Sequence, residues 1–420
     1  MQRSSSGRGG NQRSHCREHD ADAEPPTVNI VIPRTPSSKA IAPYTCRSDA
    51  EDASLQLLIN HYVTFITQKT VTSPGPRREW FPFAVRESAF FHAMMAGTAS
   101  HLAYMRNESG DNAEYFYHRG AAISLVNRGI ASGKAATEGI IATVAAFTQQ
   151  ESLAAQVKSV RLHLNGMVQL IGLAGGLMSP ILRPKTRRRV LQSDLSAAIV
   201  LMQPPRLQPT LLDPDVSAYF GPPSYCTIRH ARTLGTCLTN FTASQELSEV
   251  AVNIYWGLRN ISASLEAIQA GTEVADAVEE CVQFSDRVEV LERATHTFWY
   301  CDAEDSTSSI FRLFGWASLI HIYTVLRELP AELRIMKLVA TRIKAEMEKC
   351  LNLNVLLATF KDLMLWIIFL GGRVSDVSYK PFFAQQAAKI LLVINITEDQ
   401  ADILQASQRF LWPERSVLKC

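Results

Sequence analysis

Histidine, carboxylate and basic side chains are the groups in this 420-residue chain that could do chemistry. His92 and His101 stand in one predicted helix, where two histidines can share a metal if they are one turn apart. Their separation of nine positions amounts to about two and a half turns, so these two rings cannot meet at one ion. We therefore expect packed or hydrogen-bonded histidines rather than metal ligands.

Two pairs of glutamates lie close together in the sequence, as the two carboxylates of a general acid and base could. They are Glu279 with Glu280, and Glu289 with Glu292. All four lie on the polar faces of helices whose other face is apolar, which is the usual arrangement of solvent-exposed carboxylates. We expect solvated helix faces here, and no catalytic pair.

The densest basic cluster is RPKTRRR at 183–189, just before the helical stretch VLQSDLSAAIVLM. Its members are Arg183, Lys185, Arg187, Arg188 and Arg189. This much local charge could contact phosphate or a nuclear-import receptor, and the alternative is a solvated loop and helix start. The cluster has no aromatic residue nearby in the sequence and no helix-turn-helix or zinc context, so it is not expected to read a DNA sequence.

Charge and cysteine usage exclude several classes of protein. The formal net charge of +2 is too small to predict a dedicated nucleic-acid binder. Eight cysteines are scattered without a C-x-x-C pair, so we expect no zinc framework, no metal and no cofactor. Because the opening MQRSSSGRGG lacks the apolar segment of a secretory signal, we expect a reducing compartment, with Cys281 and Cys350 acting as small core residues.

Apolar residues recur at helical spacing along most of the chain, and no alternating strand pattern competes with them. The first fifty residues are rich in Ser, Arg, Pro and acidic residues, which predicts a disordered tail over 1–50. From there to about 415 the sequence predicts an all-α fold, an irregular multi-helix bundle of antiparallel helices joined by short connections. Several prolines interrupt it at 203–224, where we expect a long surface loop.

The most apolar stretch is MLWIIFLGGRVSD at 364–376. It is too short to cross a membrane, because Gly371, Gly372 and Arg373 break it well before about 20 apolar residues. We expect a buried core helix that ends at one of these glycines. GLAGG at 172–176 lacks both the G-x-G-x-x-G order and a preceding strand, so we interpret it as a helix stop and not as a dinucleotide site.

Several fragments, in order, resemble the helical regulatory region of fungal-specific transcription factors. They are LLINHYVTFITQKTV, Trp80, SAFFHAMMAGTASHLAYM, EYFYHRGAAISLVNRGI, LHLNGMVQLIGLAGGL, MLWIIFLGGRVSD and RFLWPE. The resemblance covers about 52–415, and its most specific part is HLNGMVQLIGLAGGL, with His163, Gly166 and the Gly175-Gly176 pair. Family members usually also carry a zinc-cluster DNA-binding domain with six cysteines within roughly thirty residues, whereas the first fifty residues here contain only Cys16 and Cys46.

The resemblance implies a nuclear, non-enzymatic transcription regulator that lacks the zinc-cluster DNA reader. Its expected partners are the transcriptional machinery or another transcription factor, with DNA contacted only indirectly or weakly and no membrane contact. It also implies a small effector between helices and a homodimer, although no sustained heptad repeat is present. Two alternatives stay open: a helical enzyme or metabolite-binding protein using dispersed residues such as His92, Glu151 and His163, and a cytoplasmic helical scaffold.

Overall fold

The computed structural model describes the larger part of the chain. The described residues are 49–66, 74–208 except 107, 109, 111 and 135, 247–269, 278–299, 306–394 except 351, and Leu411. They are helical, and none of them forms a strand, which confirms the all-α prediction. The predicted tail lies outside the described residues, apart from its last positions at the start of the first helix, and so does most of the predicted loop at 203–224.

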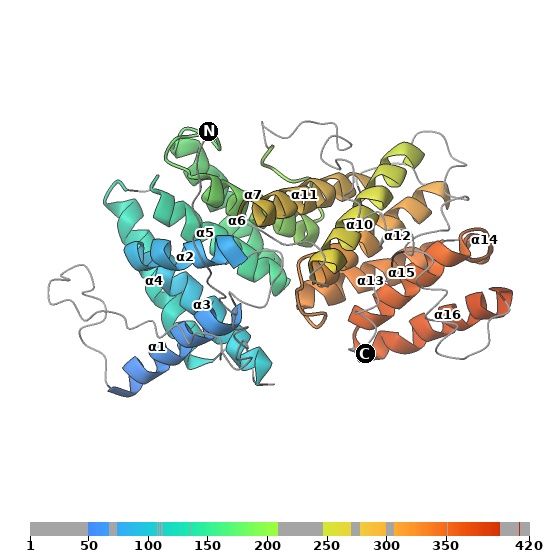
Figure 1. Ribbon diagram of the computed structural model, residues 1–420, viewed down its shortest axis with the longest axis horizontal. Coiled ribbons are helices and arrows are strands. Elements are labelled where there is room, and N and C mark those ends of the chain that lie inside the picture. Colours follow the sequence, from blue (N-terminus) through green and yellow to red (C-terminus); the bar gives the residue numbers. More distant parts are fainter. Residues whose placement is uncertain are drawn as a thin grey trace, which may run out of the picture. The chain divides into compact units, whose positions relative to one another are not determined.

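The first group of helices precedes residue 202 (Figure 1). Its elements are α1 (Asp49–His61), the π-helix η2 (Tyr62–Ile66), α2 (Pro74–Arg86), α3 (Ser88–Met105), α4 (Ala113–Ala131), α5 (Glu138–Leu153), α6 (Val157–Leu173) and α7 (Pro184–Leu201). α5 is the central element, because it packs on α3, α6 and α7 and most of its residues are buried. Side-chain caps start two of these helices: Asn112 accepts from the Tyr115 amide, and Thr137 accepts from the Ile140 amide.

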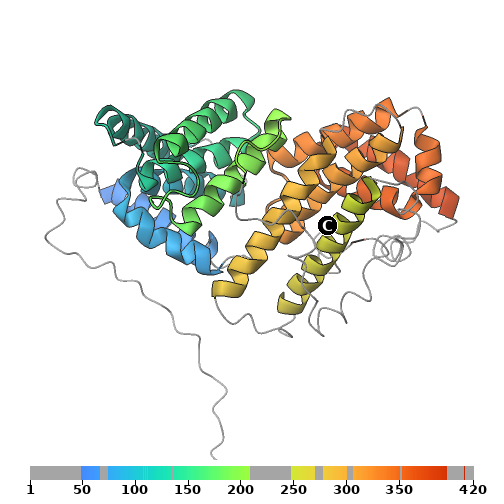
Figure 2. The same ribbon diagram turned by 90° about the horizontal axis from the view of Figure 1, so that it is seen from above.

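The second group begins at residue 247. Its elements are α10 (Leu247–Gln269), α11 (Val278–Thr295), the 3-10 helix η4 (His296–Trp299), α12 (Ser306–His321), the π-helix η5 (Ile322–Leu326), α13 (Arg334–Lys349), α14 (Leu353–Thr359), α15 (Lys361–Val374), the 3-10 helix η6 (Val377–Tyr379) and α16 (Lys380–Ile394). α12, α13 and α15 pack on one another, and α16 packs on α15. In both views α7 and α11 lie side by side where the two groups adjoin (Figures 1 and 2).

The stretch at 364–376 is a core helix, as predicted, but its predicted end is wrong. α15 continues through both glycines to Val374. A Cβ atom on Gly371 would lie 2.6 Å from Cε1 of Phe383, so this glycine allows α16 to approach closely. The other predicted stop is confirmed, because α6 ends at Leu173 and both Gly175 and Gly176 have φ near +95°.

Prolines stand at the start of α2 and of α7. Pro74 and Pro76 lie in the first turn of α2, where a missing N–H is tolerated. α2 also contains Pro82 in its interior. The basic cluster at 183–189 forms the first turns of α7 instead of a loop before it, with Pro184 at the N-terminus.

Among the residues that the structure describes, one apolar segment is long and apolar enough to cross a membrane, judged by length and composition alone. It is Ser309–Leu326, which covers most of α12 and continues through η5, and α14 and α15 pass the same test only as a pair bent by 113°. Because 83% of Ser309–Leu326 is buried inside the protein, it has the character of a core helix. In α13 the residues Met336, Val339, Ile343 and Met347 recur at helical spacing and are buried, so this helix has one apolar face.

Candidate functional site

α7 is one of the helices through which the first group contacts the second, together with α2 and α5. Most of its residues from Val190 to Leu201 are buried, including the polar Ser193, Asp194 and Ser196. Buried polar groups need partners, so the partners of α7 show what it is attached to. Its partners on other elements lie on α5, on α11, in η5 and on α13.

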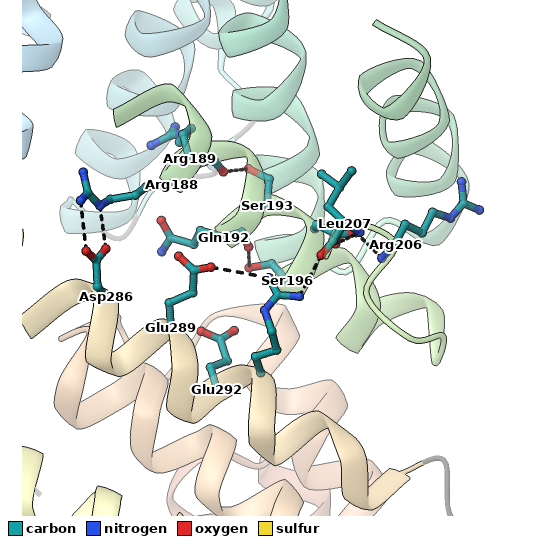
Figure 3. A network of polar contacts seen from close by, with 12 residues as sticks. Arg188, Arg189, Gln192, Ser193, Ser196, Arg206, Leu207, Asp286, Glu289 and Glu292 are labelled. Carbon is teal, nitrogen blue, oxygen red and sulfur yellow. Dashed lines mark hydrogen bonds and ion pairs between the residues drawn. The ribbon is translucent and has the colours of Figure 1, made fainter. Parts of the chain in front are cut away.

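The basic cluster occupies the N-terminal turns of α7, and its five side chains are directed to different partners. Arg183 binds Glu138 of α5 with Nε 2.7 Å from Oε2, and Arg187 donates to the Leu182 carbonyl at 2.9 Å. Arg188 binds Asp286 of α11 through two hydrogen bonds, at 2.6 and 3.0 Å (Figure 3). That this basic cluster binds phosphate or a nuclear-import receptor stays a prediction.

Aromatic rings of α2 lie against the same cluster. Lys185 Nζ is 5.4 Å from the ring centre of Trp80 and 5.2 Å from that of Phe83. The guanidinium groups of Arg183 and Arg189 lie over Phe83 and Trp80, at 4.9 and 5.9 Å. Both rings are buried, so these are cation–π contacts within the fold, from residues about a hundred positions away in the sequence.

The middle of α7 contributes to a chain of buried hydrogen bonds. Ser196 Oγ lies 2.9 Å from Tyr323 Oη, and the Tyr323 hydroxyl donates to Glu292 of α11 at 2.9 Å. Arg327 holds the same carboxylate with Nε and Nη2 at 3.0 and 2.5 Å from Oε2. The Glu292 side chain is fully buried, so this pairing compensates a charge that water cannot reach.

The C-terminal end of α7 is capped by α13. Arg342 donates to the carbonyl oxygens of Ile199 at 2.6 Å and Val200 at 3.3 Å, which belong to the last turn of α7. Its guanidinium lies 4.9 Å from the ring centre of Trp316, which stacks on Trp299 at 4.2 Å. A cation at the carbonyl end of a helix is favourable, because the helix dipole is negative there.

We call these three sets of contacts together the α7 seam. It consists of Arg188 with Asp286, Ser196 with Tyr323, Glu292 and Arg327, and the carbonyls of Ile199 and Val200 with Arg342.

The residues that follow α7 are held by the same surroundings. Met202 has φ +52°, a left-handed conformation that reverses the chain. The Asp194 carboxylate then accepts the amides of Arg206 at 3.1 Å and Leu207 at 2.8 Å, and Arg293 of α11 donates to the Leu207 carbonyl at 3.0 Å. Burial raises the pKa of Asp194 even though both amides act to lower it.

Burial dominates the electrostatics of the seam. It raises the pKa of Tyr323 well above its ordinary value, and the nearby Glu292 charge adds to the increase. Burial also acts to lower the pKa of Arg327, but the charges of Glu292 and Tyr323 outweigh it and the net shift is upward. The Arg327 guanidinium therefore remains charged, and the Tyr323 hydroxyl remains protonated as a donor.

The expectation of solvated faces for Glu289 and Glu292 is wrong. Their exposed fractions are 6% and 0%. Asp286, Glu289 and Glu292 recur every three residues, which places them along one side of α11, and that side meets α7 (Figure 3). This spacing was a usable signal, but the sequence could not show that cations and a tyrosine from distant helices would meet it. The side chains of Glu279 and Glu280 lie outside the described residues.

The predicted histidines are hydrogen-bonded, as expected. His92 and His118 share a hydrogen bond between Nδ1 atoms 2.8 Å apart, and His61 Nε2 lies 2.9 Å from His101 Nδ1. Within the described part of the chain, no three His, Cys, Asp or Glu side chains could together hold a metal ion. The Cys350 side chain is half-buried, and that of Cys281 lies outside the described residues.

The dispersed residues of the alternative hypothesis have structural partners of their own. Glu151 binds Arg119 at 2.6 Å, and His163 stacks on Phe147 at 5.4 Å between ring centres. Burial lowers the pKa of His163, the Glu151 charge acts against this, and the Arg119 charge adds to it. That these residues bind or transform a metabolite stays a prediction.

The sequence of the first group matches a known family. Residues 56–202 match the model of the fungal specific transcription factor domain, and the matched segment ends one residue after α7. The match confirms the predicted family resemblance over this segment and indicates transcription regulation as the class of function. No match to a curated protein or to a solved structure was found.

Proposed function

We propose that this protein is a nuclear, non-enzymatic transcription regulator in which the α7 seam transmits changes between the helices after residue 247 and the family-matched segment. The family match supports the regulatory class and a nuclear location. The seam supports the transmission, because its hydrogen bonds join the matched helices to the later ones at specific positions.

One observation carries the transmission step: α7 is held along its whole length by different later elements. α11 binds its first turns, Tyr323 of η5 contacts its middle, and α13 caps its last turn. A displacement of any of these elements must break hydrogen bonds to α7 or move α7 with it. Packed interfaces of this kind change between discrete arrangements, which is how a local event reaches a distant surface.

The transmitted change alters how the matched segment binds other proteins. The transcriptional machinery or another transcription factor is the expected partner, and DNA is contacted only weakly or through that partner. A small effector bound between the later helices, or association with a second copy of the chain, would act by shifting the position of α7.

A tethered reporter assay tests the regulatory function. The full chain is fused to a heterologous DNA-binding module, and transcription of a reporter is compared with that of the module alone. We expect a change in transcription that Arg342→Met reduces, because this variant loses the cap on α7. Lys349→Met, on an exposed position of the same helix, serves as the matched control. If the tethered full chain leaves the reporter unchanged, the proposed function is wrong.

DNA binding is tested separately with the purified full chain. Random-sequence and genomic duplexes are titrated at increasing salt, and we expect weak binding that disappears as salt rises, with no preference among sequences. Tight and selective binding would contradict the proposal that DNA is reached indirectly. Fluorescence microscopy of a tagged full chain checks the nuclear location.

A further inference from the structure

Three carboxylates of α11 stand in a row toward α7, and they are not equally compensated (Figure 3). The two outer ones have close partners. Asp286 receives two hydrogen bonds from Arg188, at 2.6 and 3.0 Å. Glu292 receives hydrogen bonds from Tyr323 and from two nitrogen atoms of Arg327.

The middle carboxylate, Glu289, has a longer ion pair than its two neighbours. Its Oε1 atom is buried without a hydrogen bond among the described residues, and Nη2 of Arg293 lies 3.5 Å away. Arg293 uses Nη1 for the Leu207 carbonyl, while its Nε and Nη2 make no hydrogen bond within the described ranges. Glu289 thus lacks the close two-point contact that both neighbouring carboxylates have.

The surroundings of Glu289 oppose its charge more than they support it. Burial disfavours an ionised carboxylate, and the like charges of Asp286 and Glu292 on the same helix add to this. Arg293 and Arg327 act in the opposite direction. Figure 3 also shows Arg188 and Arg189 on the facing helix α7, and the first of these is bound to Asp286.

We propose that the α7 seam is proton-linked: a proton bound at Glu289 strengthens the packing of α11 on α7, and its release weakens that packing. A neutral carboxyl removes the central charge of the row and can donate a hydrogen bond. Release of the proton places three negative charges side by side in a buried contact. The regulatory meaning of this step rests on the proposed function, because it would make the transmission sensitive to pH.

The pKa of Glu289 supports the direction. Burial raises it from 4.5 to about 7. Since the folded protein holds this proton more tightly than the unfolded chain, the contribution to stability is complete below pH 4.5 and is lost as pH rises to about 7. The contact therefore changes within the neutral range, where an ordinary glutamate is fully ionised.

Hydrogen exchange of the purified full chain tests the proposal. Protection factors, which are corrected for intrinsic exchange rates, are measured at about pH 5.5 and about pH 8.5. We expect protection of α7 and α11 to fall at least about tenfold at the higher pH, since one pKa unit corresponds to tenfold. In Glu289→Gln the protection of both helices should be the same at both pH values.

Two controls make the result specific to Glu289. Glu348→Gln removes an exposed carboxylate on α13 and should keep the wild-type pH response, and α4 should be protected equally at both pH values in every variant. The proposal would be overturned if the protection of α7 and α11 fell equally with pH in the wild type and in Glu289→Gln. It would also be overturned if this protection did not change with pH in the wild type.

Infrared spectroscopy gives a second readout that needs no stable Gln variant. A protonated carboxyl has its own carbonyl band, which should titrate near neutral pH in the wild type and be absent from Glu289→Met, a variant of similar volume. A wild type without a band titrating near neutral pH would refute the protonation step. These measurements use isolated protein, so an inactive reporter leaves their outcome unchanged and is a separate failure.

Discussion

The α7 seam and the apolar contact among α12, α13 and α15 hold the chain in two different ways. The apolar contact consists of fully buried side chains without charge, among them Phe314, Leu319, Val339, Ile343, Leu365 and Trp366. Its stability comes from area removed from water and from dense packing, neither of which depends on direction or pH. The seam depends on paired charges and capped carbonyls, so loss of one partner leaves the other unpaired. The comparison teaches that the stability of the apolar contact depends on side-chain volume, whereas that of the α7 seam depends on the pairing of charges and hydrogen-bonding groups.

The largest effect is expected in the apolar contact. Trp366→Ala should lower the free energy of unfolding by about 3 to 5 kcal/mol, because it leaves a cavity beside Phe314, whose ring centre is 6.2 Å away. Urea unfolding measures this. Trp256→Ala, at a position that is 40% exposed, is the control and should cost much less. Equal losses in the two variants would mean that burial does not decide the cost.

The seam should respond to the loss of one partner and recover with the loss of both. Arg327→Met leaves the fully buried Glu292 charge unpaired and should cost about 3 kcal/mol or more. Adding Glu292→Gln removes that charge and keeps an acceptor for Tyr323, so the double variant should regain most of the stability. A double-mutant cycle measured by urea unfolding checks this. Additive losses would show that the seam is held by volume as well.

Close packing of α15 and α16 predicts an intermediate effect. Gly371→Ala places a methyl group 2.6 Å from Cε1 of Phe383, and the strain should cost about 1 to 3 kcal/mol. Gly166→Ala is a suitable comparison, because no atom lies within 4 Å of its added Cβ and alanine favours helices. The two melting temperatures should move in opposite directions. A shift in the same direction would contradict the role of Gly371 in the approach of α16.

The smallest effect is expected at the partly exposed end of the seam. Arg188 and Asp286 are 36% and 32% exposed, so Arg188→Met should cost no more than about 1 kcal/mol, and less in high salt. Unfolding at two salt concentrations measures this, with Lys337→Met as the control, because Lys337 and its partner Asp376 are 38% and 49% exposed. A loss as large as that of Arg327→Met would place this pair among the buried charges.

The sequence predicts helices well and their distant partners poorly. The apolar faces of α13 and α15 follow from spacing alone, because Met336, Val339 and Ile343 repeat with the helix. The end of α15 could not be predicted, since Gly371 serves a neighbour that arrives twelve residues later. A glycine can end a helix or allow another helix to pack closely against it, and only the tertiary structure shows which of these roles applies.

Some features of the candidate site could be predicted from the sequence, and others could not. The cluster at Arg183 to Arg189 is visible as charge, but its aromatic neighbours in α2 and its partner Asp286 are about a hundred positions away. Glu289 and Glu292 have the spacing of one helix face, and a polar residue on such a face is normally solvated. Arg293 is near Glu289 through its i,i+4 spacing in the same helix, but the proximity of Arg327 to Glu292 is not encoded by any local pattern.

The cap that Arg342 places on the last turn of α7 shows that the family-matched segment and the structural surroundings of α7 have different limits. The family match ends at Met202, immediately after that turn, while the guanidinium that binds the Ile199 and Val200 carbonyls comes from Arg342, far beyond the match. A fragment cut at 202 would carry the recognisable sequence but present open carbonyls and an uncovered apolar side of α7 to water. The part of the chain that the family model recognises is thus smaller than the set of residues that hold α7 in place.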